Sequence, residues 1–186
     1  VCSSDLVAMA TTTLVASSSL AEPKAKVPEA TVVAMSPTFT WNGVTVSNQG
    51  RLFVSMQRDV KDSTTPSVGE ILPNGTIAAF PGGSWNQFRW GNSGENQFIG
   101  INSVVSDSKD QLWVVDPAGI GGQPIAGKAK LVQIDIPSRK VVRVYRLDTK
   151  VVPKGGFIND VRVGGGYAYL PDSSLGALIV VNLSTG

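Results

Sequence analysis

The stretch from Phe157 to Leu183 reads FINDVRVGGGYAYLPDSSLGALIVVNL and contains a full set of strand and turn signals. Asn159 stands near its start, three glycines follow, and an alternating aromatic run extends from Tyr167 to Leu170 before an apolar run that starts at Ala177. Alternation with a period of two is typical of a half-buried β-strand, and the Gly and Pro-Asp-Ser-Ser segments are typical of turns. The stretch therefore predicts three short antiparallel strands in succession.

The same pattern occurs twice upstream at a nearly constant spacing. Asn42 precedes the run RLFVS that begins at Arg51, and Asn102 precedes the run QLWVVD that begins at Gln111. The three asparagines are 60 and 57 residues apart (102 − 42 and 159 − 102). A supersecondary unit that recurs at a nearly fixed period indicates a repeat architecture, in which each unit packs on the next.

The segments between these markers supply the other strands. We expect strands at 44–47, 52–57, 68–72 and 76–80 in the first unit and at 103–106, 112–116, 130–136 and 141–147 in the second; the third unit has its first three strands and stops at 186. Four short antiparallel strands in succession form one blade of a β-propeller, and propellers close with about 4–8 blades. We therefore predict an all-β fold without helix, a partial propeller of about two and a half to three blades that is truncated at its C-terminus.

Composition limits the chemistry that this sequence can support. The 186 residues carry a net charge of +2, contain no histidine, and have Cys2 as their single cysteine. These counts exclude a Ser-His-Asp triad, a Cys-His pair and any zinc or copper site with His or Cys ligands. The sequence has no Lys/Arg patch that indicates nucleic-acid binding and no apolar stretch of the ~18 residues that a membrane span needs.

The N-terminal residues differ in composition from the rest. Residues 1–6 resemble a translated adapter remnant, and residues 7–20 are apolar and rich in small side chains. Ser19-Leu20-Ala21 fits the small-x-small pattern that signal peptidase cleaves, so we expect a signal peptide and a secreted or periplasmic protein. The other interpretation of this segment is a disordered leader.

These features divide the chain into three parts. We expect a remnant plus signal peptide at 1–21, a linker at 22–29, and the N-terminal part of a propeller domain at 30–186. The β-branched run at 30–35 has no partner strand before Asn42. Propellers often close their ring by pairing a terminal strand with the last blade, and this run is our candidate for that strand.

An asparagine begins each repeat unit. Because the innermost strand of a blade starts near the central channel, we expect Asn42, Asn102 and Asn159 to meet at the channel mouth together with Asp160, a carboxylate that the other two units lack. Such oxygens suit calcium or a polar small ligand, and Asn102, Asn159 and Asp160 are the candidate metal ligands. The alternative is structural, since asparagine also caps turns by bonding to the backbone.

The long segment from 81 to 99 carries aromatic residues among Gly, Asn and Gln. Loops of this length within a compact repeat are often functional. Trp85 and Phe98 are therefore candidate walls of a ligand site. Ordinary packing over the face of the propeller is the equally weighted alternative.

Several segments between Trp41 and Gly186 resemble the major royal jelly/Yellow protein family: GRLFVSMQR, GEILPNGTIAAFPG, INSVVSDSKDQLWVVD, AKLVQIDIPSRKVVRVYRLD, GGFINDVRV and AYLPDSSLGALIVVNL. The resemblance implies a six-bladed β-propeller that is usually secreted. Insect members include salivary proteins that bind biogenic amines and Yellow proteins linked to melanin chemistry, and bacterial relatives are often labelled as dopachrome-tautomerase-related. The sequence has no cysteine after Cys2, so the disulfides of insect members are not expected here.

A more distant resemblance is to the gluconolactonase/regucalcin-like propellers, in which axial Asn, Asp and Glu side chains hold a calcium-type cation for lactone hydrolysis. Our leading hypothesis is the binding of a small aromatic or amine ligand at the channel mouth, with a relation to dopachrome tautomerase. The alternative is a calcium-dependent lactonase or related hydrolase. The sequence does not decide between binding and catalysis, and it selects no oligomeric state.

Overall fold

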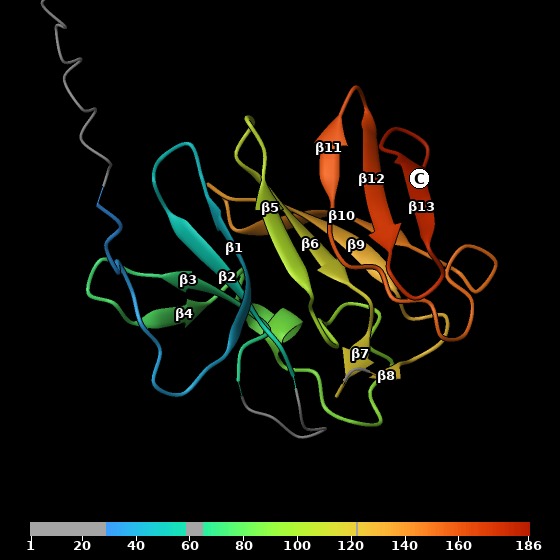
Figure 1. Ribbon diagram of the computed structural model, residues 1–186, viewed down its shortest axis with the longest axis horizontal. Helices are drawn as coiled ribbons and strands as arrows, with labels where there is room; N and C mark the ends of the chain where they lie inside the picture. The colour runs from blue at the N-terminus through green and yellow to red at the C-terminus, as the bar shows by residue number, and fades with distance from the viewer. Residues whose placement is uncertain (1–28, 59–64, 122) are drawn as a thin grey trace, which may run out of the picture. The chain divides into compact units, whose positions relative to one another are not determined.

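The computed structural model describes residues 29–58, 65–121 and 123–186. The chain divides into two units, Val1–Val32 and Val33–Gly186. The adapter-like remnant, the expected signal peptide and almost all of the expected linker lie outside the described residues. The architecture below is that of the second unit, which is drawn in colour in Figure 1.

Blade 1 is an antiparallel sheet of four strands in the order of the chain: β1 (Trp41–Val46), β2 (Leu52–Met56), β3 (Val68–Ile71) and β4 (Ile77–Ala79). The turn between β1 and β2 ends at Gly50, whose φ of 76° is a conformation that only glycine adopts without steric cost. A second tight turn joins β3 to β4, where the Asn74 side chain accepts a hydrogen bond from the backbone N–H of Thr76 at 3.0 Å. Local turn chemistry thus sets the register of both hairpins.

Blade 2 repeats this sheet with β5 (Ser103–Ser106), β6 (Gln111–Asp116), β9 (Lys130–Asp135) and β10 (Lys140–Arg146), in the order β10-β9-β6-β5. A small hairpin of β7 (Gly119–Ile120) and β8 (Gln123–Pro124) occupies the loop between β6 and β9. The sequence predicted this loop without strands. Strands of two residues are too short to produce a hydrophobic period, which explains why they were missed.

Blade 3 consists of β11 (Arg162–Gly164), β12 (Tyr167–Asp172) and β13 (Ala177–Asn182). The two four-stranded sheets and this three-stranded sheet are all antiparallel and follow one another along the chain. The protein is therefore an all-β partial propeller, and the predicted fold class is confirmed. The observed strands lie within a few residues of the predicted ones.

One local prediction is wrong, because a 3-10 helix, η1 (Gly83–Asn86), forms where no helix was expected. Residues 30–35 form no strand here, and their pairing with a last blade stays a prediction. The helix presents Asn86 to blade 1, where its side-chain oxygen accepts the backbone N–H groups of Ser67 and Val68 at 2.8 and 3.0 Å.

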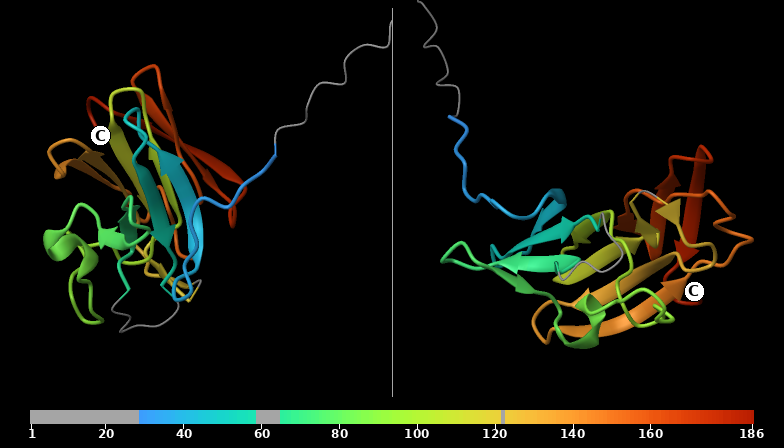
Figure 2. Two further views of the ribbon diagram at one scale, coloured as in Figure 1. Left: turned by 90° about the vertical axis from the view of Figure 1, so that its left-hand side faces the viewer. Right: turned by 90° about the horizontal axis from the view of Figure 1, so that it is seen from below.

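The sheets of successive blades lie next to one another (Figure 2), and apolar side chains fill the layer between each neighbouring pair. The first layer joins Phe53, Val68 and Phe80 of blade 1 to one face of blade 2, namely Leu112, Val114, Val132 and Ile134. The second layer joins the opposite face of blade 2 to blade 3 and includes Trp113, Val115, Leu131, Tyr145, Ala168, Leu170, Ile179 and Val181. Alternate side chains of β6 point into different layers, as the period of two requires. Burial of both faces holds adjacent blades together.

Candidate functional site

Three asparagine side chains connect the blades at the starts of their innermost strands. The Asn42 amide group donates from Nδ2 to the side-chain oxygen and the backbone carbonyl of Asn102, at 2.5 and 2.8 Å. Asn102 in turn donates from Nδ2 to the side-chain oxygen and the backbone carbonyl of Asn159, at 2.6 and 3.0 Å. We refer to Asn42, Asn102 and Asn159 as the asparagine ladder.

Backbone hydrogen bonds within each blade hold the ladder residues in place. The backbone N–H of Asn102 donates to Val115 at the end of β6, at 3.0 Å, and that of Asn159 donates to Pro171 in β12, at 2.9 Å. Asn102 and Asn159 therefore lie opposite equivalent points of their second strands, whereas in blade 1 the register shifts between Trp41 and Gly43, where Asn42 lies.

A buried carboxylate fixes the chain segment that leads into the ladder. Asp116, at the end of β6, accepts the backbone N–H groups of Ile99 and Gly100 at 2.9 and 3.1 Å, and Lys130 lies 2.9 Å from its other side. Both charged side chains are almost fully buried. Asp116 also accepts the Ala118 N–H at 2.8 Å, as an acidic turn residue does, and its bonds to Ile99 and Gly100 anchor residues 99–100.

Asp160 also bridges two blades. Its Oδ1 accepts the Ser103 hydroxyl group of blade 2 and its neighbour's backbone N–H, both at 2.8 Å, and its Oδ2 lies 2.7 Å from Arg162 Nη1. The Asp160 side chain is 38% exposed and that of Arg162 is 72% exposed. Protein groups therefore contact both oxygens of the carboxylate, while the side chain as a whole stays partly exposed.

Packing explains why blade 1 has no side chain at this position. The matching residue of blade 1 is Gly43, where a Cβ atom would lie 2.9 Å from the Ser55 hydroxyl oxygen and 3.2 Å from Val104 N. That hydroxyl group accepts the Gly43 N–H at 2.8 Å and donates to the Asn102 carbonyl at 3.1 Å. Ser55 thus occupies the space that a side chain at position 43 would need.

The four predicted channel-mouth residues line one open hollow of about 360 Å³, whose walls are Asn42, Gly43, Val44, Asn102, Ser103, Val104, Val105, Asn159, Asp160 and Arg162. The structure therefore brings Asn42, Asn102, Asn159 and Asp160 together. Whether they bind a ligand or a metal stays a prediction. The hollow is lined on three sides by different blades, which matches the position expected for the mouth of a channel.

Trp85 and Phe98 lie apart from this hollow. Their rings are 5.1 Å apart, Phe98 has no exposed surface, and both pack against the apolar layer between blades 1 and 2. Their backbones are joined as well, because Phe98 N–H donates to the Trp85 carbonyl at 2.7 Å. The loop therefore folds back on the core, and a ligand-wall role for these two residues stays a prediction.

The donor set of the hollow bears on the predicted metal site. Within the described ranges 29–58, 65–121 and 123–186, no three His, Cys, Asp or Glu side chains form a group that could hold a metal ion. The predicted ligands Asn102, Asn159 and Asp160 supply one carboxylate, and each side-chain oxygen that faces a neighbouring blade already accepts a hydrogen bond. An amide oxygen retains capacity for a second interaction, so calcium binding stays a prediction that uses these remaining lone pairs.

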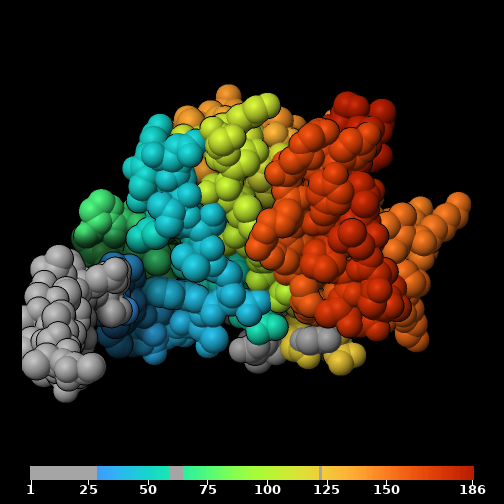
Figure 3. Space-filling view, turned by 45° about the horizontal axis from the view of Figure 1, so that its top comes forward, coloured from blue at the N-terminus to red at the C-terminus, as the bar shows by residue number. Residues whose placement is uncertain are grey.

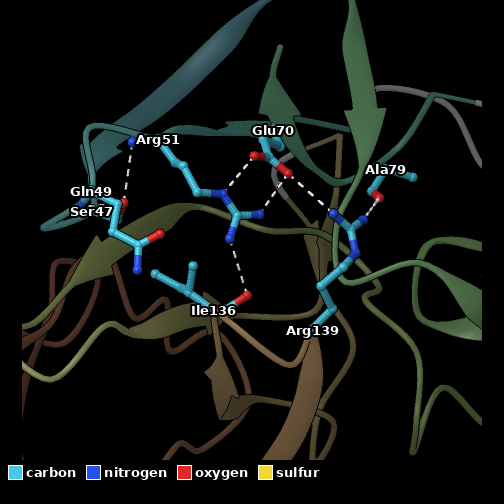
Figure 4. A network of polar contacts seen from close by, with 7 residues as sticks. All are labelled: Ser47, Gln49, Arg51, Glu70, Ala79, Ile136 and Arg139. Carbon is cyan, nitrogen blue, oxygen red and sulfur yellow. Dashed lines mark hydrogen bonds and ion pairs between the residues drawn. The ribbon is translucent and has the colours of Figure 1, made fainter.

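Strand alternation predicts that Arg51, Arg58, Arg143 and Arg162 lie on solvated strand faces, and for the first three this prediction is wrong. Arg51 forms two hydrogen bonds with Glu70, at 2.7 and 2.8 Å, and donates to the Ile136 carbonyl of blade 2 at 3.2 Å. Arg139 of blade 2 reaches back to Glu70 at 3.1 Å (Figure 4). Arg58 is buried, and Arg143 donates to the carbonyl of Leu183 at 2.7 Å. Only Arg162 is as exposed as predicted. Strand alternation predicts on which face of the sheet a side chain lies, but it does not predict which groups of the neighbouring blade pack against that face.

Residues 100–186, which contain blades 2 and 3, match the family model described as "Major royal jelly protein", so the resemblance read from the sequence is confirmed there. No curated protein matched the chain. The described residues contain no helix that is long and apolar enough to cross a membrane.

Solved structures similar to this chain include a catalytically inactive virginiamycin B lyase from Staphylococcus aureus with quinupristin (14% identity, TM-score 0.45). A gluconolactonase from Xanthomonas campestris (13%, 0.47) and a protein of unknown function from Bacteroides caccae (13%, 0.46) are also similar. The matches cover 83%, 75% and 80% of this chain and 45%, 42% and 48% of those chains. The chain thus spans less than half the length of each.

Proposed function

We propose that this chain is part of a binding propeller of the royal jelly/Yellow type, six-bladed when complete, whose channel mouth binds a small amine. The observation that carries the proposal is the direction of hydrogen bonding at the hollow. The amide N–H groups of Asn42 and Asn102 are used within the ladder, whereas the side-chain oxygens keep capacity to accept. The hollow therefore offers acceptors from the ladder beside donor groups on Asn159 and Arg162, and a ligand that brings donors fits these acceptors.

Asp160 adds the charge that favours an ammonium group over a hydroxyl group. It is the one carboxylate among the residues that line the hollow, and its Oδ2 faces solvent beside Arg162. A hydrogen bond between charged groups is roughly twice as strong as one between neutral groups. An amine would compete with the exposed Arg162 guanidinium group for the same oxygen. The aromatic character of the ligand rests on the family resemblance, because the described lining contains no aromatic side chain.

The test is calorimetric titration of the protein with tyramine, a small aromatic amine. We expect Asp160→Asn to weaken tyramine binding about tenfold, because loss of a charge-assisted hydrogen bond costs about 1.5 kcal/mol. Arg162→Gln should strengthen binding, since it removes the competing cation. Glu95→Gln, at an exposed carboxylate outside the hollow, is the control and should leave the affinity unchanged. Equal affinity in the wild type and Asp160→Asn would contradict the proposal.

The alternative is a calcium-dependent lactonase or related hydrolase of the gluconolactonase type. It is favoured by the convergence of amide oxygens with a carboxylate, which are ligands that calcium accepts. Titration with calcium chloride distinguishes the amine-binding protein from the calcium-dependent hydrolase. Calcium affinity that falls in Asp160→Asn, together with no tyramine binding, would support the hydrolase.

Secretion and a relation to dopachrome tautomerase extend the same proposal. Secretion rests on residues 7–21 and on the family resemblance. A tautomerase needs a group that removes a proton and one that returns it, and among the described residues the hollow provides Asp160 as its single carboxylate. Turnover of dopachrome that is lost in Asp160→Asn would add a catalytic role to the binding role.

A further inference from the structure

Asp172 of blade 3 and Asp116 of blade 2 occupy equivalent positions. Each is the last residue of the second strand of its blade, β12 or β6, and the residue before it accepts the backbone N–H group of that blade's ladder asparagine. Both are almost fully buried, with relative exposures of 2% and 0%. In Figure 3, blade 3 is the orange-red sheet beside the yellow-green β5–β6 turn of blade 2. A buried carboxylate therefore recurs at this position in two successive blades.

The carboxylate of Asp116 has partners on both oxygens. Its Oδ1 accepts the backbone N–H groups of Gly100 and Ala118. Its Oδ2 accepts the backbone N–H group of Ile99 and lies 2.9 Å from the Lys130 ammonium nitrogen. Lys130 is the residue that pairs with Asp116 across β6 and β9. The buried negative charge is therefore compensated by a cation on the neighbouring strand.

Asp172 has such partners on one oxygen only. Its Oδ1 accepts the backbone N–H groups of Ser174 and Leu175 at 3.0 and 2.9 Å. Its Oδ2 is buried and has no hydrogen-bond partner among the residues that the structure describes. The residue that pairs with Asp172 on β13 is Ala177, which takes the place of Lys130 and brings no charge. A buried carboxylate oxygen without a partner costs the full desolvation of that oxygen, so a positively charged partner is strongly favoured there.

A second oxygen lies close to Asp172 Oδ2. A Cβ atom added at Gly156 would lie 2.8 Å from this oxygen and 3.1 Å from the Pro153 carbonyl oxygen, so both oxygens converge on one point beside the Gly156 backbone. These are distances at which an ammonium nitrogen bonds to oxygen. The Pro153 carbonyl group accepts the Gly156 N–H and keeps a second lone pair. A methyl group of Val152 lies 2.9 Å from the same point, so a cation that contacts both oxygens requires a different Val152 rotamer.

We propose that Asp172 Oδ2 and the Pro153 carbonyl oxygen bind a monovalent cation of ammonium size, either potassium or ammonium itself. The ion takes the role that the Lys130 ammonium group has in blade 2. One carboxylate beside a carbonyl group suits a single positive charge, whereas calcium takes about 6–8 oxygen ligands. Neither residue lines the hollow at the asparagine ladder, so the site is independent of the proposed amine site.

The test is thermal unfolding of the whole chain in potassium, ammonium or tetramethylammonium chloride at equal ionic strength. At about 100 mM, potassium and ammonium should raise the unfolding temperature by roughly 3 °C relative to the bulkier tetramethylammonium, because a ligand that binds only the folded state stabilises it. Asp172→Asn should abolish this difference. Asp148→Asn is the matched control, since Asp148 accepts backbone N–H groups in the same kind of turn but is exposed, and it should leave the difference unchanged.

A second variant supplies the charge instead of removing the carboxylate. Ala177→Lys introduces the ammonium group that blade 2 has, so it should raise the unfolding temperature in tetramethylammonium chloride and make it independent of the cation. Asp160→Asn should leave the cation effect unchanged, which separates this site from the channel mouth. Absence of a cation effect in the wild type, or its persistence in Ala177→Lys, would overturn the proposal. A wild type that is insensitive to the cation but destabilised by Lys154→Gln would assign the charge to that exposed loop side chain instead.

Discussion

The junction between blades 1 and 2 and the junction between blades 2 and 3 have the same backbone register but different contents. In the first, Phe80 lies between two guanidinium groups, with its ring centre 5.6 Å from Arg51 and 4.7 Å from Arg139. Glu70 accepts hydrogen bonds from both arginines (Figure 4). The residue at the matching position of blade 2 is Tyr145, and one guanidinium group, that of Arg143, lies 4.8 Å from its ring.

The direction of the arginine contact also differs. Arg139 of blade 2 reaches back to the Ala79 carbonyl of blade 1 at 3.1 Å, whereas Arg143 of blade 2 reaches forward to the Leu183 carbonyl of blade 3 at 2.7 Å. Blade 2 therefore supplies an arginine to each of its neighbours. The comparison shows that a few side chains decide how a junction is filled, while the repeat determines only that a junction exists.

The largest expected effect is a difference in stability between variants of the two junctions, in which the equivalent residues Glu70 and Gln133 are each replaced by alanine. Glu70→Ala should lower the free energy of unfolding by about 2 kcal/mol, because it leaves Arg51 and Arg139 without their carboxylate in a half-buried setting. Gln133→Ala, the matched change in the second junction, should cost less than about 1 kcal/mol. Urea unfolding of both variants measures the difference, and equal losses would show that the ion network contributes no more than an amide pair.

A smaller effect should appear when the pH is lowered. The hydrogen bond from Arg51 holds the pKa of Glu70 below its ordinary value of 4.5, and the charge of Arg139 acts in the same direction. Since the folded state binds the proton less readily than the unfolded state, this stabilisation is complete above pH 4.5 and is lost as the pH falls through the lowered pKa.

Thermal unfolding between about pH 3 and about pH 7 tests this expectation, because that range extends from below to well above the ordinary pKa of a glutamate side chain. Glu70→Gln should flatten the acid part of the curve, because an amide does not titrate there. The Asp135 carboxyl group, whose pKa is lowered by hydrogen bonds from Ser138, titrates in both proteins and cancels in the difference. A wild-type and a variant curve that run parallel below pH 4.5 would exclude a stabilising role for the charge.

The smallest effect concerns the second junction alone. The Tyr145 hydroxyl group donates to the Leu183 carbonyl at 3.1 Å, so Tyr145→Phe should cost about 1 kcal/mol. The same carbonyl also accepts from Arg143, which limits the loss. A loss of more than about 3 kcal/mol in urea unfolding would mean that the hydroxyl group carries the junction, and that the apolar layer contributes less than its burial suggests.

The fold was readable from the sequence because its signals are local and repeated. Asn42, Asn102 and Asn159 mark the start of each blade, and the turns and alternating strands recur around them. The convergence of these asparagines with Asp160 also followed from the repeat, since equivalent positions of successive blades meet at the axis. What was missed is η1, where Asn86 is held by Ser67 and Val68, and the hairpin of β7 and β8, because neither has a period of its own.

The detailed chemistry was not readable, because it depends on contacts between blades that are about 60 residues apart in sequence. Glu70 and Arg139 give no sign in the sequence that they share a junction, and Asp116 resembles any acidic turn residue. The hydrogen bonds that join Gln111 to Gln133 and to Asp135 likewise become visible only in the folded sheet. Each of these features arises from side-chain packing, which alternation does not encode.

The asparagine ladder has a direction. Asn102 donates from its amide N–H group toward the following blade and accepts at its side-chain oxygen from the preceding one. One asparagine thus supplies a blade with both the donor and the acceptor that its two neighbours need. Repeats with this polarity are interchangeable. The gain or loss of a whole repeat keeps every donor amide opposite an acceptor oxygen, whereas an insertion or deletion within a repeat separates donor from acceptor. The amide dipoles also align head to tail, so each bond polarises the next. The ladder thus supplies a rule for joining blades that is independent of how many blades the ring contains.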